Sequence, residues 1–372
     1  MSFRWFLRDP CRSTKERNAM RQICLLLAIL CLSVASVSHA QQSVILDDDC
    51  SNDVDCVVTM PVLFEMQHRG DLRVLAVMAD SANPLSAPVF KIFATQAGYG
   101  ETPIGANQTN EPSTALSRSN GANASVWTQG LVARFDAGDT RSKYPDCAML
   151  YRKTLAAAKE HSVSIAVTGF PTCLNQLLTT KADGVSSLSG EEMVKQKVSL
   201  LSVMGGQYPS GKEWNFTSEA PGWNALFTMW TKQHGFPPIF LNGFSNGLHV
   251  IAGPVKDSDP KTDPTRYALD LAHTSTRPMW DMLSVQFAAW GAEHDGATWF
   301  TVSDPGTVRV DAATGLSNWE SAVDSGHFTI ANARSDEAFD AWLDARTHQG
   351  LLFVAERRRK SEQPKLPAIS KP

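Results

Sequence analysis

The chain lacks the sequence features of several large classes of protein. A net charge of −4 over 372 residues gives no basic surface for nucleic acid. The apolar stretch Ile23–Val37 is too short for a comfortable membrane span, and no segment repeats along the chain. We therefore expect a small-molecule ligand and no nucleic-acid partner.

The N-terminal region is typical of a secretory signal. Arg21 precedes the apolar stretch, and a small-x-small cleavage site ends at Ala40. We predict that residues 1–40 are a leader and signal peptide, with Met20 as an alternative start. No cysteine follows the cleavage site, so a lipid anchor is not indicated. The expected location is periplasmic or secreted, without membrane attachment after cleavage.

Removal of the signal leaves an even set of cysteines: Cys50, Cys56, Cys147 and Cys173. In an oxidising compartment four cysteines can pair in three ways, and the sequence alone does not choose among them. One pairing, Cys50 with Cys56, would clasp the segment between them. The alternative is four ordinary buried thiols.

Acidic residues crowd directly after the apolar run Ser43–Leu46. The five aspartates of this loop are Asp47, Asp48, Asp49, Asp53 and Asp55. Such crowding at the end of a buried strand is costly unless a cation neutralises it or some carboxylates stay protonated. The loop is therefore predicted to be a divalent-metal site, and the alternative is a solvated acidic loop.

The ligand types in this loop restrict the ion. Oxygen ligands favour Ca²⁺ or Mg²⁺, whereas zinc would call for thiolate or imidazole, and we expect Ca²⁺. An EF-hand is excluded by counting from Asp47. The sixth position is Asn52 instead of glycine, and the twelfth is Val58 instead of glutamate.

Short apolar runs alternate with amphipathic or capped segments along the chain. The predicted strands are 72–77, 163–167, 198–203, 238–241 and 248–252. The predicted helices include 146–160, 171–179, 264–273 and 281–290. This alternation predicts an α/β fold, with a single open, mostly parallel sheet and helices on both faces.

The C-terminal part is predicted to contain one more helix and a tail. The helix starts at the capping residue Ser335 and stops at Gly350. The α/β domain is expected to span residues 41–355. Residues 356–372 are basic and Pro-spaced, which predicts a disordered tail.

Five motifs between Ser43 and Leu351 occur in an informative order. They are the loop 47–56; Leu75–Val77 with Asn83 and 98–105; 165–169 with Asn175; Met204–Gly206 with Glu213–Phe216; and Trp280-Asp281. Each motif alone is common, but together they resemble the inosine-uridine-preferring nucleoside hydrolase family, especially its bacterial nucleoside hydrolase-like branch. The resemblance implies a Rossmann-like core and Ca²⁺-dependent hydrolysis of the N-glycosidic bond of ribonucleosides or related N-ribosides. It also suggests a homo-oligomer, on weaker grounds.

The resemblance also implies a role for individual residues. Asp49 would be the catalytic base, and Asp47 would orient the loop behind it. The expected metal ligands are Asp49, Asp281, the Thr168 carbonyl, and one of Asp53 and Asp55. The expected substrate-binding residues are Asn52, Asn83, Glu213, Asn215 and Trp280. Without that context, Asp281 is as well explained as a helix N-cap, and Asn215 as a structural hydrogen-bonding residue.

Two departures from the family pattern leave other functions open. Cys56 stands where the last aspartate of the loop is expected, which removes a charge and a hard oxygen. Trp280 stands where some members have a histidine, and it can stack on a base but cannot readily donate a proton. The first alternative is a non-catalytic nucleoside-binding protein on the same fold. A second alternative is independent of these departures: the strand followed by Asp47-Asp48-Asp49 also resembles the start of a haloacid-dehalogenase-type phosphatase, with Asp47 as nucleophile.

Overall fold

The computed structural model describes residues 41–51, 53–111, 125–135, 140–248 and 251–362. Residues from Gln42 onward form one compact unit, so the chain divides next to the predicted cleavage site. The predicted leader, 1–40, lies outside the described residues. Its cleavage stays a prediction.

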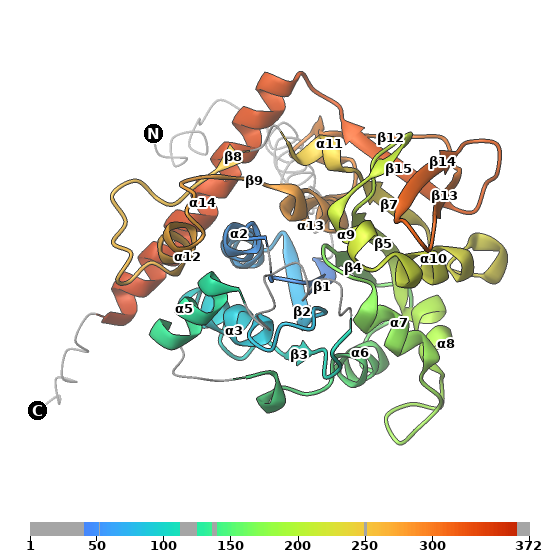
Figure 1. Ribbon diagram of the computed structural model, residues 1–372, viewed down its shortest axis with the longest axis horizontal. Coiled ribbons are helices and arrows are strands. Elements are labelled where there is room, and N and C mark those ends of the chain that lie inside the picture. Colours follow the sequence, from blue (N-terminus) through green and yellow to red (C-terminus); the bar gives the residue numbers. More distant parts are fainter. Residues whose placement is uncertain (1–40, 52, 112–124, 136–139, 249–250, 363–372) are drawn as a thin grey trace, which may run out of the picture. The chain divides into compact units, whose positions relative to one another are not determined.

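An eight-stranded sheet forms the centre of the unit (Figure 1). Its strands, in spatial order, are β12 (Phe300–Val302), β15 (His327–Asn332), β7 (Ile239–Asn242), β5 (Val198–Met204), β4 (Val163–Val167), β1 (Gln42–Asp48), β2 (Leu72–Ala79) and β3 (Ile104–Ala106). Neighbours pair in parallel, except for the antiparallel pair β12 and β15. The prediction of one open, mostly parallel sheet is confirmed.

Helices cover both faces of the sheet because its central strand is apolar on both. In β1, Val44 and Leu46 belong to one buried cluster and Ile45 to the other. The first cluster contains residues of α2 (Cys56–Arg69), α3 (Ser86–Gln96), α5 (Val126–Phe135), α12 (Pro264–Leu271), α13 (Trp280–Trp290) and α14 (Asp336–Glu362). The second contains residues of α6 (Cys147–Ala156), α7 (Thr172–Thr179), α8 (Gly190–Lys197), α9 (Trp214–Ser218) and α10 (Ala220–Met229).

Short elements surround this core. They are the 3-10 turns Arg141–Lys143 and Lys232–His234, helix α11 (Phe244–Gly247), and small sheets of β6 (Ser210–Lys212) with β13 (Thr307–Val310) and β14 (Leu316–Glu320), β8 (Ile251–Ala252) with β9 (Arg277–Pro278), and β10 (Glu293–His294) with β11 (Ala297–Thr298). In the predicted strand 248–252, only Ile251–Ala252 is a strand among the described residues, and it pairs with β9 outside the large sheet.

The predicted end of the last helix is wrong. Helix α14 continues through Gly350 to Glu362, so residues 356–362 are helical and not part of a disordered tail. A Cβ at Gly350 would lie 2.8 Å from the backbone of Val62, so this glycine permits close packing of α14 on α2 (Figure 1). Residues 363–372 lie outside the described residues. Within the described part of the chain, no helix is both long and apolar enough to cross a membrane.

Candidate metal-binding and active site

The acidic loop lies where the carboxyl ends of parallel strands meet. β1 ends at Asp48 and its neighbour β4 ends at Val167, and the backbone N–H of Thr168 donates to the Asp47 carbonyl at 2.8 Å. In an open α/β sheet this edge is where ligands bind. A cavity of about 340 Å³ opens here, lined by Asp49, Asp53, Asp55, Thr168, Met204, Glu213, Trp214, Asn215, Phe244, Arg277, Trp280 and Asp281.

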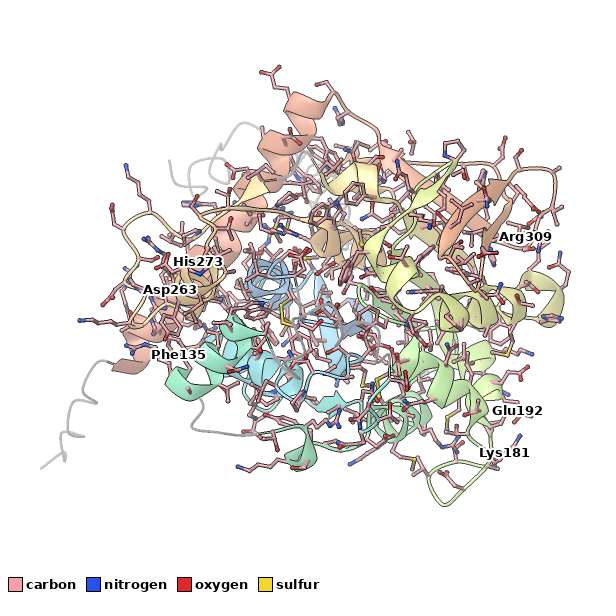
Figure 2. All side chains as sticks on the ribbon, viewed as in Figure 1. Phe135, Lys181, Glu192, Asp263, His273 and Arg309 are labelled. Carbon is pink, nitrogen blue, oxygen red and sulfur yellow. A yellow bond between two sulfur atoms is a disulfide. The ribbon has the colours of Figure 1, made fainter. Side chains whose placement is uncertain are left out.

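The carboxyl groups of this site are buried, unlike ordinary charged side chains. Lys181, Glu192 and Arg309, for example, are exposed at the periphery of the unit (Figure 2). By contrast, the exposed fraction is at most 6% for each of Asp47, Asp48, Asp49, Asp55 and Asp281. Water therefore cannot screen the repulsion among these acids.

Burial is the main reason why these acids hold their protons tightly. It raises the pKa of Asp47, Asp49, Asp55 and Asp281 well above the usual range of a carboxyl group, and that of Asp48 to about 6. Repulsion from neighbouring aspartates adds to the shift. A bound cation would reverse this effect, because it favours the ionised form.

Two helices point their N-termini at the acids. Asp55 is the N-cap of α2, and Asp281 lies in the first turn of α13, whose N-cap is Met279. The Asp55 and Asp281 side chains share a hydrogen bond, so the two carboxyl groups meet although they come from distant parts of the chain. Because Met279 is the N-cap of α13, Asp281 is not the N-cap of its helix. The positive ends of both helices stabilise negative charge at this point.

Asp53 lines the cavity but is paired with a cation. Its Oδ1 accepts from Arg277 Nε at 2.7 Å and from the Val54 backbone N–H at 2.6 Å, and its Oδ2 accepts from Arg277 Nη2. Of the two carboxylates considered for the metal, Asp55 thus faces Asp281 and Asp53 faces Arg277. Asn52 lies outside the described residues.

The predicted sugar-binding residues separate into two groups. Glu213 and Asn215 line the cavity, and Asn215 Nδ2 donates to the Thr168 carbonyl at 3.0 Å. Glu213 caps α9 and accepts from three backbone N–H groups, while burial raises its pKa to about 7. Asn83 is buried but does not line the cavity, and its Oδ1 accepts from the Leu85 backbone N–H at 2.9 Å.

Aromatic side chains line another part of the cavity. Trp280 stacks on Phe244 with 5.4 Å between ring centroids and donates its Nε1–H to the Phe244 carbonyl at 2.9 Å. Trp214 also lines the cavity. Such a surface can stack on a planar base, but the Trp280 side chain cannot readily donate a proton to that base.

Asp47 lies behind the cavity and not in it. Its side chain is fully buried, Oδ2 accepts from the Tyr151 hydroxyl at 2.8 Å, and Oδ1 has no hydrogen-bond partner. This position fits the predicted supporting role. It does not fit a phosphatase nucleophile, which must reach its substrate.

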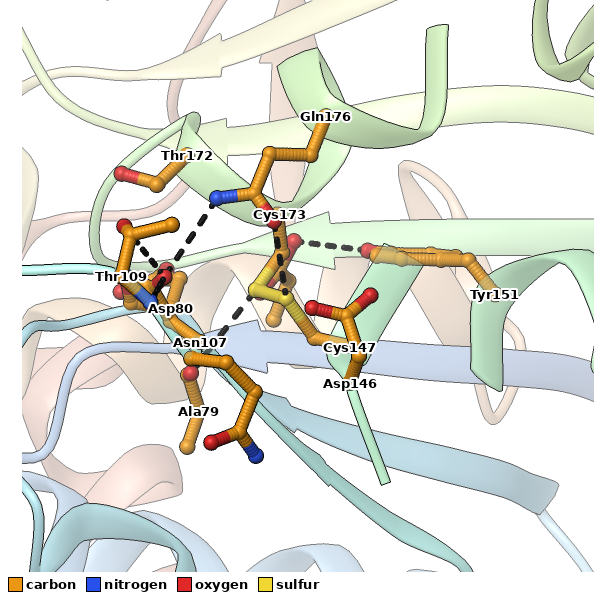
Figure 3. Close-up of a disulfide and its surroundings, with 12 residues drawn as sticks. Ala79, Asp80, Asn107, Thr109, Asp146, Cys147, Tyr151, Thr172, Cys173 and Gln176 are labelled. Atoms are coloured by element: carbon orange, nitrogen blue, oxygen red, sulfur yellow. Dashed lines mark hydrogen bonds between the residues drawn. A yellow bond between two sulfur atoms is a disulfide. The ribbon is translucent and has the colours of Figure 1, made fainter. Parts of the chain in front are cut away.

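Two disulfides brace the site. Cys50 pairs with Cys56, and Cys147 with Cys173. This is one of the three pairings that the sequence left open. The first closes the acidic loop and leaves Cys56 without a thiol. The second joins α6, which also carries Tyr151, to α7 (Figure 3). Asp48 Oδ and both sulfur atoms of the first bridge lie within 4.8 Å of one another, but disulfide sulfurs offer no thiolate to a metal.

Sequence reasoning missed three residues that support the site. Asp80 directly follows β2, is fully buried, and accepts from the Phe170 backbone N–H at 2.8 Å through Oδ2, while its Oδ1 has no partner. Its place after a strand was a usable signal. Tyr151 on an amphipathic helix and Arg277 in the short strand β9 carried no comparable signal.

Comparisons by sequence find no matching family model and no matching curated protein. Solved structures do match. A plant nucleoside hydrolase, PpNRh1, is 13% identical with a TM-score of 0.56, over 82% of this chain and 99% of that one. An inosine-guanosine nucleoside hydrolase is 12% identical with a TM-score of 0.60, over 83% and 98%. The type III effector XopQ, solved with adenosine diphosphate ribose, is 15% identical with a TM-score of 0.59, over 93% and 99%.

These likenesses define the class of fold. The chain has the α/β fold of the nucleoside hydrolases, as the five motifs predicted. At such low identity, similarity of structure carries the fold alone. Neither the inosine-uridine-preferring branch nor the activity follows from it.

Proposed function

We propose that the protein is a Ca²⁺-dependent hydrolase that cleaves the N-glycosidic bond of ribonucleosides or related N-ribosides. The observation that carries this proposal is the convergence of Asp49, Asp55 and Asp281 beside one cavity. When these acids are ionised, their burial and mutual repulsion favour a bound cation. A nucleoside hydrolase-like fold around that cavity supports the choice of reaction.

The donor set fits a hard ion. We infer that Asp49, Asp55, Asp281 and the Thr168 carbonyl hold it, since all are oxygen donors at the cavity. Among the described residues, the Thr168 carbonyl accepts a hydrogen bond from Asn215 through one lone pair and has a second lone pair for an ion. When bound, calcium would orient the sugar hydroxyls and acidify a water molecule.

The remaining roles belong to residues of the chain. Asp49 takes the proton of the attacking water, whose oxygen bonds to the anomeric carbon as the carbon–nitrogen bond breaks. The electron pair of that bond leaves with the base, which then takes up a proton. We assign ribose binding to Glu213 and Asn215 and base stacking to Trp280 and Phe244, because all four side chains line the cavity. A polar sugar pocket would reject ribosides that lack the hydroxyls.

A nucleoside- or ADP-ribose-binding protein without catalysis is the second candidate. The pairing of Asp53 with Arg277 favours it, because it removes one carboxylate from the ion. The ADP-ribose complex of XopQ supports the ligand class. For either function we propose a periplasmic or secreted location, since two disulfides persist best in an oxidising compartment.

One experiment separates the two functions. Purified mature protein is incubated with purine and pyrimidine nucleosides, with calcium or with a chelator, and free ribose is measured. A hydrolase releases ribose only with calcium, loses the release in Asp49→Ala, and keeps it in Asp270→Ala, which removes an exposed aspartate of α12. Binding of a nucleoside by calorimetry without ribose release would instead favour the binding protein.

A further inference from the structure

A bidentate ion pair joins the acidic loop to the segment that carries Asp281. Arg277 lies on β9, three residues before α13 begins, and its guanidinium donates to both carboxylate oxygens of Asp53. Oδ1 of Asp53 also accepts from the Val54 backbone N–H. Both oxygens of Asp53 are therefore occupied.

This pair belongs to the cavity itself. Asp53 and Arg277 both line it, and Arg277 is the only basic residue among the described residues that do. The guanidinium also lies over the Trp280 ring, with 5.3 Å between its central carbon and the ring centroid. Arg277 is thus fixed between the acidic and the aromatic parts of the cavity.

Metal ligation by Asp53 competes with this pairing. Arg277 holds both oxygens of the Asp53 carboxylate, and a divalent cation on the same carboxylate would repel the guanidinium, so ligation is weaker while the pair is intact. Exchange is feasible, since the side chains of Arg277 and Asp53 are 37% and 27% exposed and partly exposed pairs are weak.

We propose that Arg277 is a latch that withholds Asp53 from the cation site and thereby sets its calcium affinity. The inference rests on the proposed function only in taking the ion to be calcium. Releasing the latch adds a carboxylate to the donor set, and a site with more carboxylates binds calcium more tightly. Arg277 is a positioning residue in this account, because it acts through Asp53.

Calcium titration by calorimetry tests the latch through binding instead of activity. In Arg277→Gln the freed Asp53 should tighten calcium binding by about five- to tenfold. Arg277→Lys, which keeps the charge but loses the bidentate geometry, should give a smaller gain. Arg266→Gln is the matched control, because it breaks an exposed Arg–Asp pair, with Asp270, away from the cavity. It should leave calcium binding unchanged.

A double-mutant cycle separates the latch from simple loss of a positive charge. If Arg277 acts through Asp53, the gain from Arg277→Gln shrinks to less than about twofold when Asp53 is already Asn. An equal gain in both backgrounds would overturn the latch, because the arginine would then act through its field alone. The unfolding temperatures of Arg277→Gln and Arg266→Gln serve as a folding control. If the two temperatures are equal, a changed calcium affinity of Arg277→Gln is not due to misfolding.

The remaining outcomes distinguish the latch from the proposed function. Calcium binding by the wild type with no gain in Arg277→Gln or Arg277→Lys overturns the latch and leaves the metal site standing. Binding only in Arg277→Gln supports the latch and favours a binding protein over an enzyme. Absence of calcium binding in every variant contradicts both the latch and the calcium-dependent hydrolase.

Discussion

Replacement of Tyr151 by Phe should weaken the acidic site from behind, without touching the cavity. The Tyr151 hydroxyl donates to Asp47 Oδ2 at 2.8 Å, and both side chains are fully buried. Burial and the charge of Asp47 raise the pKa of Tyr151, so the hydroxyl keeps its proton and remains the donor. The other oxygen of Asp47 has no partner, so Tyr151→Phe leaves this carboxyl group with no side-chain hydrogen bond.

With calcium bound and Asp47 ionised, the magnitude follows from the charge of the acceptor. A buried hydrogen bond to a charged group contributes about 1.5–3 kcal/mol, against about 0.5–1.5 kcal/mol for a neutral pair. Tyr208→Phe is the matched control, because the Tyr208 hydroxyl donates to the neutral Gly205 carbonyl at 3.0 Å. We expect Tyr151→Phe to lower the free energy of unfolding in calcium by about 1 kcal/mol more than Tyr208→Phe does.

Urea unfolding and calcium titration together measure the effect. The Tyr151 hydroxyl lowers the pKa of Asp47, so its loss should make ionisation of Asp47 harder and weaken calcium binding several-fold. Equal unfolding free energies for the two variants, with calcium affinity unchanged, would refute the supporting role of Asp47.

Three further predictions concern the ion, the pH and the disulfides. Removal of calcium with a chelator should lower the unfolding free energy by about 2.7 kcal/mol relative to calcium at one hundred times its Kd. A urea-unfolding curve that does not shift when calcium is removed would contradict the metal site. Burial raises the pKa of Glu219 to about 7, so its contribution to stability is full below about pH 4.5 and is lost as the pH rises through 7. Glu219→Gln should therefore be about 1–3 kcal/mol more stable than the wild type at pH 8 but not at pH 4.5, as pH-dependent urea unfolding can test. Replacing the pair Cys147/Cys173, 26 residues apart, by Ala should cost about 3.5 kcal/mol, and replacing Cys50/Cys56, 6 residues apart, about 2 kcal/mol. In calcium titration, loss of the Cys50–Cys56 pair should weaken calcium binding more than loss of the Cys147–Cys173 pair, since the Cys50–Cys56 bridge closes the acidic loop.

The central part of the fold was predictable because its signals are local. The run Ser43–Leu46 is apolar at every position but the first, which is typical of a strand buried on both faces. Asp49 follows it, and a charge in that position is expected at the ligand-binding edge of a parallel sheet. The meeting of Asp49 with Asp281 was not local, and only the resemblance to a family predicted it.

Glycine and arginine show where sequence reasoning ends. Gly350 fits a helix stop and a close helix–helix contact equally well, and only the neighbouring backbone of Val62 decides between them. Arg277 stands in a polar segment without periodicity, so nothing in the sequence indicated that its partner would be Asp53. For the same reason, the sequence did not decide which of Asp53 and Asp55 would ligate the metal.

The crowded acids raise the free energy of the metal-free protein, and the groups around them offset only part of this cost. The N-termini of α2 and α13 favour negative charge, and the hydroxyl of Thr168 and the backbone N–H of Cys50 donate to Asp48 at 2.9 Å each. Cys50 adopts a positive φ of 36°, a conformation that the Cys50–Cys56 bridge helps to hold. Even so, the pKa of Asp49 stays raised, which means that the protein does not supply enough positive charge by itself. Because the same uncompensated charge both destabilises the metal-free protein and attracts the ion, a substitution that stabilises the metal-free form by removing an acid should weaken calcium binding.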